Sequence, residues 1–460
     1  MPARRWTSTP LLLLGIFLGL NLLGGILLAS PMAAADGVGA GFRIAFFTAV
    51  SASTVTGLTV VDTVEFWSHA GEAVIFALML LGGLEFITAA TALVNVIGRR
   101  ATRVEEDVYR DTVGSVSVRS LAGVARNILV AFSIIYVAGA ALLFVEIRTI
   151  PGLSVGEAAW QSIFLSVSAL NSAGFSILPN APGGGNAATL GAHPYLMWVI
   201  TPLIIVGALG WPYIMDLRRN RTRFSLRRWR GLFIFNFSRL TLDTRLVLIT
   251  TTGLYVFATL GFLWSEWDGV LSGHSVFGAI GLAGFHGVSG RTAGLPALDW
   301  TATRDITQQI FVFLMFVGGS TASVASGIKV NTLAVLAVAV RSSLVRNRRV
   351  EIFRRELGPA LVARAILLGM LSGLFIAILL PLMTLTDPGV PVNDLLFEVV
   401  SAFGTNGMST GVSGDISLAG DIILMVTMLV GRIGPLTLVM MLTPRDTASY
   451  RYPKERIGIG

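Results

Sequence analysis

The chain has 460 residues, of which 53% are hydrophobic and 13% charged, with a mean hydropathy of +0.75 and a formal net charge of +8. A soluble globular protein of this length does not carry so few charges, so the bilayer is the expected solvent. There is no cysteine, which excludes disulfides and thiolate metal sites. The basic balance does not indicate nucleic-acid binding, because the arginines gather between apolar runs, as membrane topology alone requires.

The first apolar run, from Pro10 to Ala29, is long enough to cross about 30 Å of hydrocarbon. Arg4 and Arg5 before it and the small residues after it also fit a secretory signal peptide, but we favour a retained helix because many spans follow. A second span is predicted from Glu72 to Val96. Between them the segment GFRIAFFTAVSA is too short to cross and leads into SASTVTGLTVVDT, where small polar residues precede Gly57.

The same order of segments recurs three more times along the chain. The second unit has predicted spans from Leu121 to Val145 and Pro194 to Met215, and the fourth has spans from Ala363 to Leu385 and Ile422 to Leu442. The third unit starts its first span near Leu246. Their short segments are VGEAAWQSIFLSVSA, HSVFGAIGLAGFHGV and VNDLLFEVVSAFG, each followed by a polar stretch that leads into Gly174, Gly294 or Gly407.

Arginine clusters separate these units, which we place at residues 1–100, 101–220, 221–350 and 351–443, followed by a tail at 444–460. The pattern predicts an all-α polytopic membrane protein of four fused helix–pore-loop–helix repeats, with eight spans and four re-entrant half-helices around one central pore. By the positive-inside rule the arginine clusters and both termini are cytoplasmic.

The four glycine stretches are the strongest functional signal. Non-helical backbone at membrane depth is tolerated only where it is buried in protein or lines a water-filled cavity. Glycine lets a loop aim carbonyl oxygens inward, and rings of such carbonyls replace the hydration shell of a cation. Glycines also serve close helix packing, but four at matching places in four repeats favour a selectivity filter.

The chain also resembles a known family, the potassium-translocating membrane subunits of the bacterial Ktr system, in the superfamily of Trk, Ktr and HKT transporters. The resemblance runs over nearly the whole chain, in the right order. The stretches that carry it are TVTGLTVVDT, NSAGFSIL, SGRTAGL, GTNGMSTG, GGSTASVASGIKVNT, GRIGPLT and the terminal RYPKERIGIG.

The resemblance implies uptake of K⁺ bound at filter carbonyls, with no covalent cofactor and with Na⁺ as a candidate activator. It further implies a bacterial cytoplasmic-membrane location, a homodimer and a cytosolic nucleotide-binding regulatory ring of the RCK type. The filter loops lie at 54–57, 171–174, 291–294 and 404–407. Their ion-binding residues are Thr54, Val55, Thr56, Gly57, Asn171, Ser172, Ala173, Gly174, Arg291, Thr292, Ala293, Gly294, Thr405, Asn406 and Gly407.

Glycine in all four key places is the potassium-selecting form of the family. Leu295 stands where phenylalanine is usual after the third glycine, and Asn406 stands where an apolar residue is common before the fourth. These departures bear on the stringency of selection, so a less selective Na⁺/K⁺ transporter is the alternative reading. The histidines at 69, 193, 274 and 286 show no ligand spacing and no catalytic motif occurs, which argues against a membrane enzyme.

The second span of the third unit carries the strip GGSTASVASG, a poor helix. Small residues can simply pack helices, but the resemblance implies an intramembrane gate loop, at 318–328. Arg432, inside an apolar run, is expected to donate hydrogen bonds to a filter loop or to this strip, and to repel cations. The predicted gate residues are Gly318, Gly319, Ser320, Thr321, Ala322, Ser323, Ser326, Gly327, Lys329 and Arg432.

Two further features each allow two interpretations. Glu85 is a charge within an apolar run, and it is expected either to pair with Lys329 or to attract cations to the inner cavity. The tail after Tyr450 could adhere to anionic headgroups, but its closing RIGIG resembles a segment that lies across the subunit interface, which predicts ordering against a second copy.

Overall fold

The computed structural model describes residues 9–97, 121–180, 185–220, 237–345 and 349–434. Within these ranges helices dominate, and the one short hairpin, β1 (Glu351–Ile352) with antiparallel β2 (Arg355–Glu356), lies between two helices of the second half. The side chains of 84–97 lie outside the described part. The predicted all-α membrane fold is confirmed, apart from this hairpin.

The first two repeats share one plan of a long helix, a re-entrant helix and a second long helix. The first repeat consists of α1 (Thr9–Leu28), α2 (Phe42–Ser53), the short α3 (Thr63–Phe66) and α4 (His69–Ile97). The second consists of α6 (Leu121–Ile147), α7 (Val155–Asn171), α8 (Gly185–Ala192), α9 (Pro194–Leu209) and α10 (Trp211–Arg219).

The third and fourth repeats follow the same plan, with an interruption in the third. The third holds the 3₁₀ turns η2 (Phe237–Arg239) and η3 (Trp300–Ala302), and the helices α11 (Leu242–Glu266), α12 (Val276–Thr292), α13 (Asp305–Phe316) and α14 (Val330–Leu344). The fourth holds α15 (Pro359–Thr386), α16 (Val392–Gly404), the 3₁₀ turn η4 (Val412–Gly414) and α17 (Leu418–Ile433).

The four re-entrant helices α2, α7, α12 and α16, here called the pore helices, each pack between the long helices of their own repeat. Side-chain caps set where two of them begin: Ser154 makes a capping box with Glu157 at α7, and Ser275 accepts from the Gly278 amide at α12. Their C-terminal halves are buried throughout. At 17 residues each, α7 and α12 extend beyond the short segments predicted, because both helices continue into the predicted filter loops.

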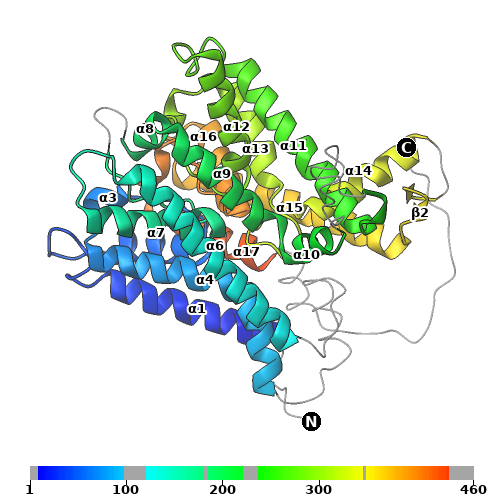
Figure 1. The fold of residues 1–460 in the computed structure, drawn as a ribbon, viewed down its shortest axis with the longest axis horizontal. Coiled ribbons are helices and arrows are strands. Elements are labelled where there is room, and N and C mark those ends of the chain that lie inside the picture. The colour runs from blue at the N-terminus through cyan, green and yellow to red at the C-terminus, as the bar shows by residue number, and fades with distance from the viewer. Residues whose placement is uncertain (1–8, 98–120, 181–184, 221–236, 346–348, 435–460) are drawn as a thin grey trace, which may run out of the picture.

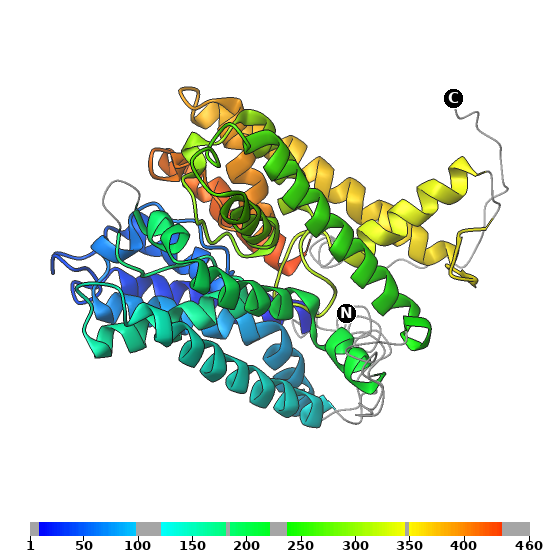
Figure 2. The ribbon, with the colours of Figure 1, turned by 45° about the horizontal axis from the view of Figure 1, so that its top comes forward.

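Figures 1 and 2 show how the repeats are arranged. The blue and cyan helices of the first half of the chain lie on one side, and the green to orange helices of the second half lie on the other. Helix α14 and the β hairpin project at one end. Contacts between α2 and α17, α4 and α7, α9 and α12, and α13 and α16 close the circle of repeats in the order one, two, three, four.

Three helices are long and apolar enough to cross a membrane within the described ranges: Arg126–Ile147 of α6, Leu242–Glu266 and Pro359–Thr386. The predicted span from Pro194 to Met215 is not one straight helix, since α9 and α10 meet at a 97° bend. Gly210 makes the bend possible with a φ of +79°, and Pro212 follows in the first turn of α10. The count of eight spans stays a prediction.

Candidate functional site

The four predicted filter glycines meet around one axis. A Cβ placed on Gly57 would lie 2.5 Å from the carbonyl oxygen of Ala173, and one placed on Gly174 would lie 3.0 Å from that of Ala293. In the same way Gly294 faces the carbonyl of Asn406, and Gly407 faces that of Thr56. Each glycine therefore lies against the residue before the glycine of the next repeat, which closes a ring in the order one, two, three, four.

All four glycines of this ring have positive φ, at +90°, +75°, +62° and +92° in chain order. A side chain is strained at such φ values, and at Gly57 it would also meet backbone atoms of the second repeat rather than a flexible side chain. The ring therefore requires glycine for two independent reasons, its backbone conformation and the close approach of the neighbouring loop.

A serine near the end of each pore helix ties the loop to the helix. The Oγ atoms of Ser51 and Ser401 accept the amide hydrogens of Gly57 and Gly407, both at 3.1 Å. Ser168 instead donates to the carbonyl of Phe175 at 2.6 Å, and Ser289 to that of Leu295 at 2.7 Å. These four buried serines were not predicted as site residues, although they stand at nearly equal distances before the four glycines.

Three of the loops leave their pore helices through the same turn. The amides of Thr56, Ala173 and Asn406 donate to the serine carbonyls five residues earlier, at 2.8, 2.8 and 2.9 Å. One residue in each of these turns is left-handed: Val55, Ser172 or Thr405, with φ of 58°, 56° and 45°. This is the Schellman ending of a helix, but without the glycine that usually takes the left-handed place. Left-handed valine and threonine are strained, and the buried surroundings hold them in place.

The third loop is built differently, because only four residues separate Ser289 from Gly294 where five separate serine from glycine in the other repeats. Here Gly294 itself donates to the Ser289 carbonyl, at 2.8 Å, and takes the left-handed conformation. Arg291 and Thr292 consequently belong to the last turn of α12. The prediction that they lie in a filter loop is therefore wrong.

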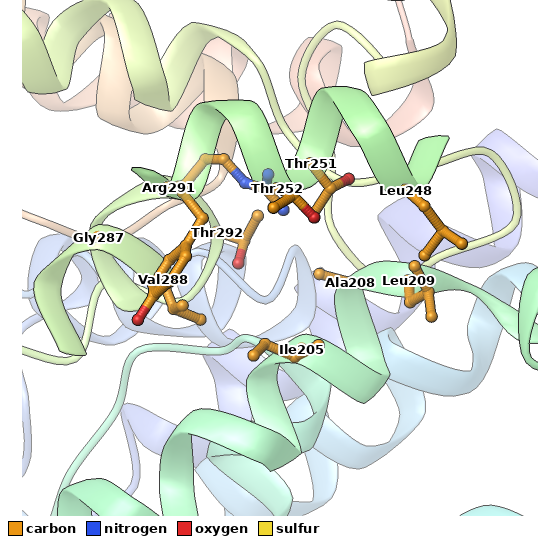
Figure 3. Close-up of a pocket in the computed structure, with 11 residues that line it drawn as sticks. Ile205, Ala208, Leu209, Leu248, Thr251, Thr252, Gly287, Val288, Arg291 and Thr292 are labelled. Carbon is orange, nitrogen blue, oxygen red and sulfur yellow. The ribbon is translucent and has the colours of Figure 1, made fainter. Parts of the chain in front are cut away.

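The side chain of Arg291 points away from the glycine ring. It lies 6% exposed in a cavity of about 180 Å³ between α9, α11 and α12, where its guanidinium faces Thr251 and Thr252 (Figure 3). The walls of this cavity are Ile205, Ala208, Leu209, Leu248, Thr251, Thr252, Tyr255, Gly287, Val288, Arg291 and Thr292. Any contact of Arg291 with an ion on the axis would have to come from its backbone carbonyl.

The other polar side chains of the loops support neighbouring backbone. Asn171 donates to the Met79 carbonyl at 3.1 Å and accepts from the Tyr136 hydroxyl at 2.6 Å. Asn406 accepts the Met408 amide at 3.2 Å and donates to the Ser289 carbonyl at 3.4 Å, so it joins the third and fourth loops. Its amide therefore has a structural use at a place where an apolar residue was expected.

The predicted gate strip is a closed loop between α13 and α14. Val317 and Ile328 form its neck through a parallel bridge, and the Gly318 amide donates to the Ile328 carbonyl at 3.0 Å. A Cβ on Gly327 would lie 3.5 Å from the Cα of Gly404, at the end of pore helix α16. The strip thus reaches the inner end of the fourth filter loop.

The opposite side of the strip lies on α9. The amides of Ser320 and Val324 donate to the carbonyls of Ala208 and Gly207, at 3.1 and 3.3 Å. The tip is a turn from Ser320 to Ser323, in which Ala322 is left-handed with a φ of 57°. The strip is therefore ordered and lies between the second and fourth repeats.

Arg432 connects the gate strip to the first repeat. Its guanidinium donates to the Val324 carbonyl, to Ser326 Oγ at 3.4 Å and to the Gly82 carbonyl of α4 at 2.5 Å. The predicted hydrogen bond from Arg432 to the strip is thus confirmed. Lys329 folds back on the strip, with Nζ 2.5 Å from the Ala325 carbonyl.

One buried acid near the filter was missed by the sequence reading. Glu398 of α16 is fully buried and accepts hydrogen bonds from Ser409 Oγ at 2.5 Å, Ser413 Oγ at 2.6 Å and the Thr410 amide at 3.2 Å. It holds the segment that follows Gly407. The side chain of Glu85, the end of the predicted span to Leu442 and the tail 444–460 lie outside the described residues.

Comparisons with known proteins agree with this geometry. The profile of the TrkH family, described as a cation transport protein, matches residues 30–449. The chain is 31% identical over 458 residues to the Ktr system potassium uptake protein B of Bacillus subtilis, covering 99% of this chain and 97% of the relative. It is also 30% identical to the potassium/sodium uptake protein NtpJ of Enterococcus hirae, with 99% and 98% covered.

Among solved structures, the potassium transporter TrkH from Vibrio parahaemolyticus superposes with a TM-score of 0.72 at 19% identity, over 96% of this chain and 87% of that one. This similarity supports the fold. The proteins named here are ion transporters and not enzymes. The chain therefore belongs to the TrkH family of cation transport proteins and is embedded in the membrane.

Proposed function

We propose that this protein takes up potassium ions through a single pathway on the axis of its four repeats, with the backbone carbonyls of the four filter loops as ligands. The observation that carries the proposal is the ring in which every filter glycine lies against a carbonyl of the next repeat. This ring supports the proposal, because neutral oxygen dipoles from all four repeats would surround one line.

The chemistry of these ligands favours a monovalent cation. The described filter loops would offer backbone carbonyls on the axis side, and Glu398, a buried acid next to them, already accepts three hydrogen bonds. Carbonyl rings suit a large, weakly hydrated ion, whereas divalent ions prefer carboxylates. The C-terminal ends of the pore helices add partial negative charge toward the same place.

The gate strip and Arg432 supply a barrier on the inner side of the filter. The close approach of Gly327 to Gly404 supports this barrier, because a strip at that place would obstruct the route beneath the fourth loop and Arg432 would add a positive charge beside it. We assign regulation to a cytosolic nucleotide-binding ring acting on a homodimer, with cytoplasmic termini in the bacterial membrane, since the matched relative is named as part of a Ktr system.

A less selective potassium and sodium transporter is the second candidate, because NtpJ is as similar to the chain as the potassium relatives are. Sodium could also act as an activator. The two readings differ in the ratio of potassium to sodium permeability.

The proposal is tested by reconstituting the full-length protein in liposomes and measuring uptake of ⁸⁶Rb⁺ in the presence of graded K⁺ or Na⁺. Competition by K⁺ at concentrations where Na⁺ has no effect supports potassium uptake. Equal competition by the two ions supports the second candidate. Absence of any Rb⁺ or Na⁺ uptake by well-folded protein would overturn both.

A further inference from the structure

Three side chains outside the predicted gate converge on the tip of the strip. They are Tyr213 of α10, Asp243 in the first turn of α11 and Asn331 in the first turn of α14. They come from the second and third repeats, and Tyr213 and Asn331 are 118 residues apart in the sequence. Tyr213 and Asn331 bond to Thr321, in the turn that forms the tip of the strip, and Asp243 bonds to both of them.

The hydrogen bonds among these groups use their polar atoms without conflict. Thr321 donates its amide to Asn331 Oδ1 at 3.1 Å, and its hydroxyl lies 2.5 Å from the Tyr213 hydroxyl. Asn331 Nδ2 donates to Tyr213 at 2.8 Å and to Asp243 Oδ1 at 2.5 Å, and Tyr213 donates to Asp243 Oδ2 at 2.8 Å. Tyrosine can donate once and accept twice, which is what this arrangement requires.

We propose that Tyr213, Asp243 and Asn331 are positioning residues that latch the tip of the gate strip in its obstructing place. This inference rests on the gate function proposed above. The latch acts on Thr321 and touches neither the glycine ring nor the predicted ion ligands. It therefore sets how often the strip moves aside, and leaves ion selection to the filter.

The backbone at the bend between α9 and α10 takes part in the same arrangement. A Cβ on Gly210 would lie 2.8 Å from the Thr321 carbonyl, and Ser320 Oγ donates to the Leu209 carbonyl at 2.5 Å. The break in the second span, which the sequence reading missed, thus makes room for the tip of the strip and brings Tyr213 to it.

Helix α10 couples this latch to the start of α11. One turn beyond Tyr213, Asp216 accepts hydrogen bonds from the Thr241 amide at 3.0 Å and from Thr244 Oγ1 at 2.6 Å, which fastens α10 to the start of α11. Tyr213 is 3% exposed, whereas Asp243 is exposed. A cytosolic partner that shifts α10, or that offers a basic group to Asp243, would therefore disturb the latch from its accessible end.

The test compares basal ⁸⁶Rb⁺ uptake by liposomes containing the full-length protein without any partner. Tyr213→Phe keeps the ring and removes the shared hydroxyl, and Asn331→Asp places a second carboxylate beside Asp243. Loss of one to two net hydrogen bonds predicts a rise in basal uptake of about threefold to tenfold for each variant. The control Tyr195→Phe, at the outer end of α9, should leave uptake at the wild-type rate.

Two readouts separate a latch from general damage. The Rb⁺ to Na⁺ ratio should stay at the wild-type value in both variants, because the filter is untouched. A protein lacking residues 320–323 should also show raised uptake, and adding Tyr213→Phe to it should raise uptake no further, since the group that the tyrosine holds is gone.

The failures of the two proposals are distinguishable. If the shortened strip raises uptake while Tyr213→Phe and Asn331→Asp both transport at the wild-type rate, the latch is wrong and the gate stands. If the shortened, well-folded protein shows no rise, the gate itself is wrong. Should one latch variant fail to fold, the other and Thr321→Ala decide the question by the same criterion, and a changed ion ratio in them would overturn the latch.

Discussion

Replacing Gly57 by serine tests whether the glycine ring selects the ion. The substitution adds a Cβ at a φ of +90°, which costs an L-residue about 1–2 kcal/mol. It also places that atom 2.5 Å from the Ala173 carbonyl oxygen and 2.7 Å from Gly174 Cα, both backbone atoms of the neighbouring repeat. Because backbone cannot rotate away, the first and second loops must separate.

Overpacking of this kind costs about 1–3 kcal/mol in addition to the strain. If about 1.4 kcal/mol of this cost changes the difference in binding free energy between Rb⁺ and Na⁺ at the ring, the permeability ratio of the two ions changes about tenfold. We therefore expect Gly57→Ser to lower the Rb⁺ to Na⁺ permeability ratio by about tenfold or more, measured by reversal potentials or by competition in liposomes.

A matched control separates the two costs. Gly273, in the loop before α12, has a φ of +94°, and a Cβ added there would have no neighbouring atom within 4 Å, so Gly273→Ser carries the strain without the clash. Gly273→Ser should lower the melting temperature, because it introduces a similar backbone strain. It should leave the Rb⁺ to Na⁺ permeability ratio unchanged. A Gly57→Ser protein with the same ion ratio as Gly273→Ser would refute the assignment of selection to the ring.

Three further predictions concern the supports of the filter and the gate. Ser401→Ala removes the acceptor of the half-buried Gly407 amide, so we expect a loss of about 1–3 kcal/mol of stability and weaker Rb⁺ uptake. Thermal unfolding and the half-saturating Rb⁺ concentration check this, and Ser30→Ala, which removes an exposed hydrogen bond, serves as control. Arg432→Gln removes the positive charge and two of the hydrogen bonds that join the strip to α4. Basal Rb⁺ flux should rise several-fold, and the Rb⁺ to Na⁺ permeability ratio should stay unchanged. A fall in flux in the folded variant would contradict the barrier role. Truncation after Tyr450 should weaken the dimer in detergent and reduce the response of transport to a cytosolic ring, without altering ion selectivity. A truncated protein that stays dimeric at high dilution and responds fully would show that the tail does not order against a second copy.

The sequence by itself determined the repeats, the four glycine loops and the interrupted span, because each of these features depends on the residue types within one short segment. An apolar segment too short to cross the membrane, followed by a glycine loop, favours a re-entrant helix. The strip GGSTASVASG cannot continue a helix favourably. The shorter third loop was also readable, since the distance from Ser289 to Gly294 differs from the serine-to-glycine distance in the other repeats.

Only the tertiary structure decided which groups meet across the repeats. Residues such as Tyr213 and Thr321 show no pattern along the chain that pairs them, because a hydrogen bond between distant segments depends on how helices pack. For the same reason Arg291 was read as part of a loop, whereas the shorter connection keeps it in α12 and turns its side chain to the cavity beside α11. Local sequence sets backbone conformation and burial, but the partners of buried polar groups are set by the packing that brings four repeats around one axis.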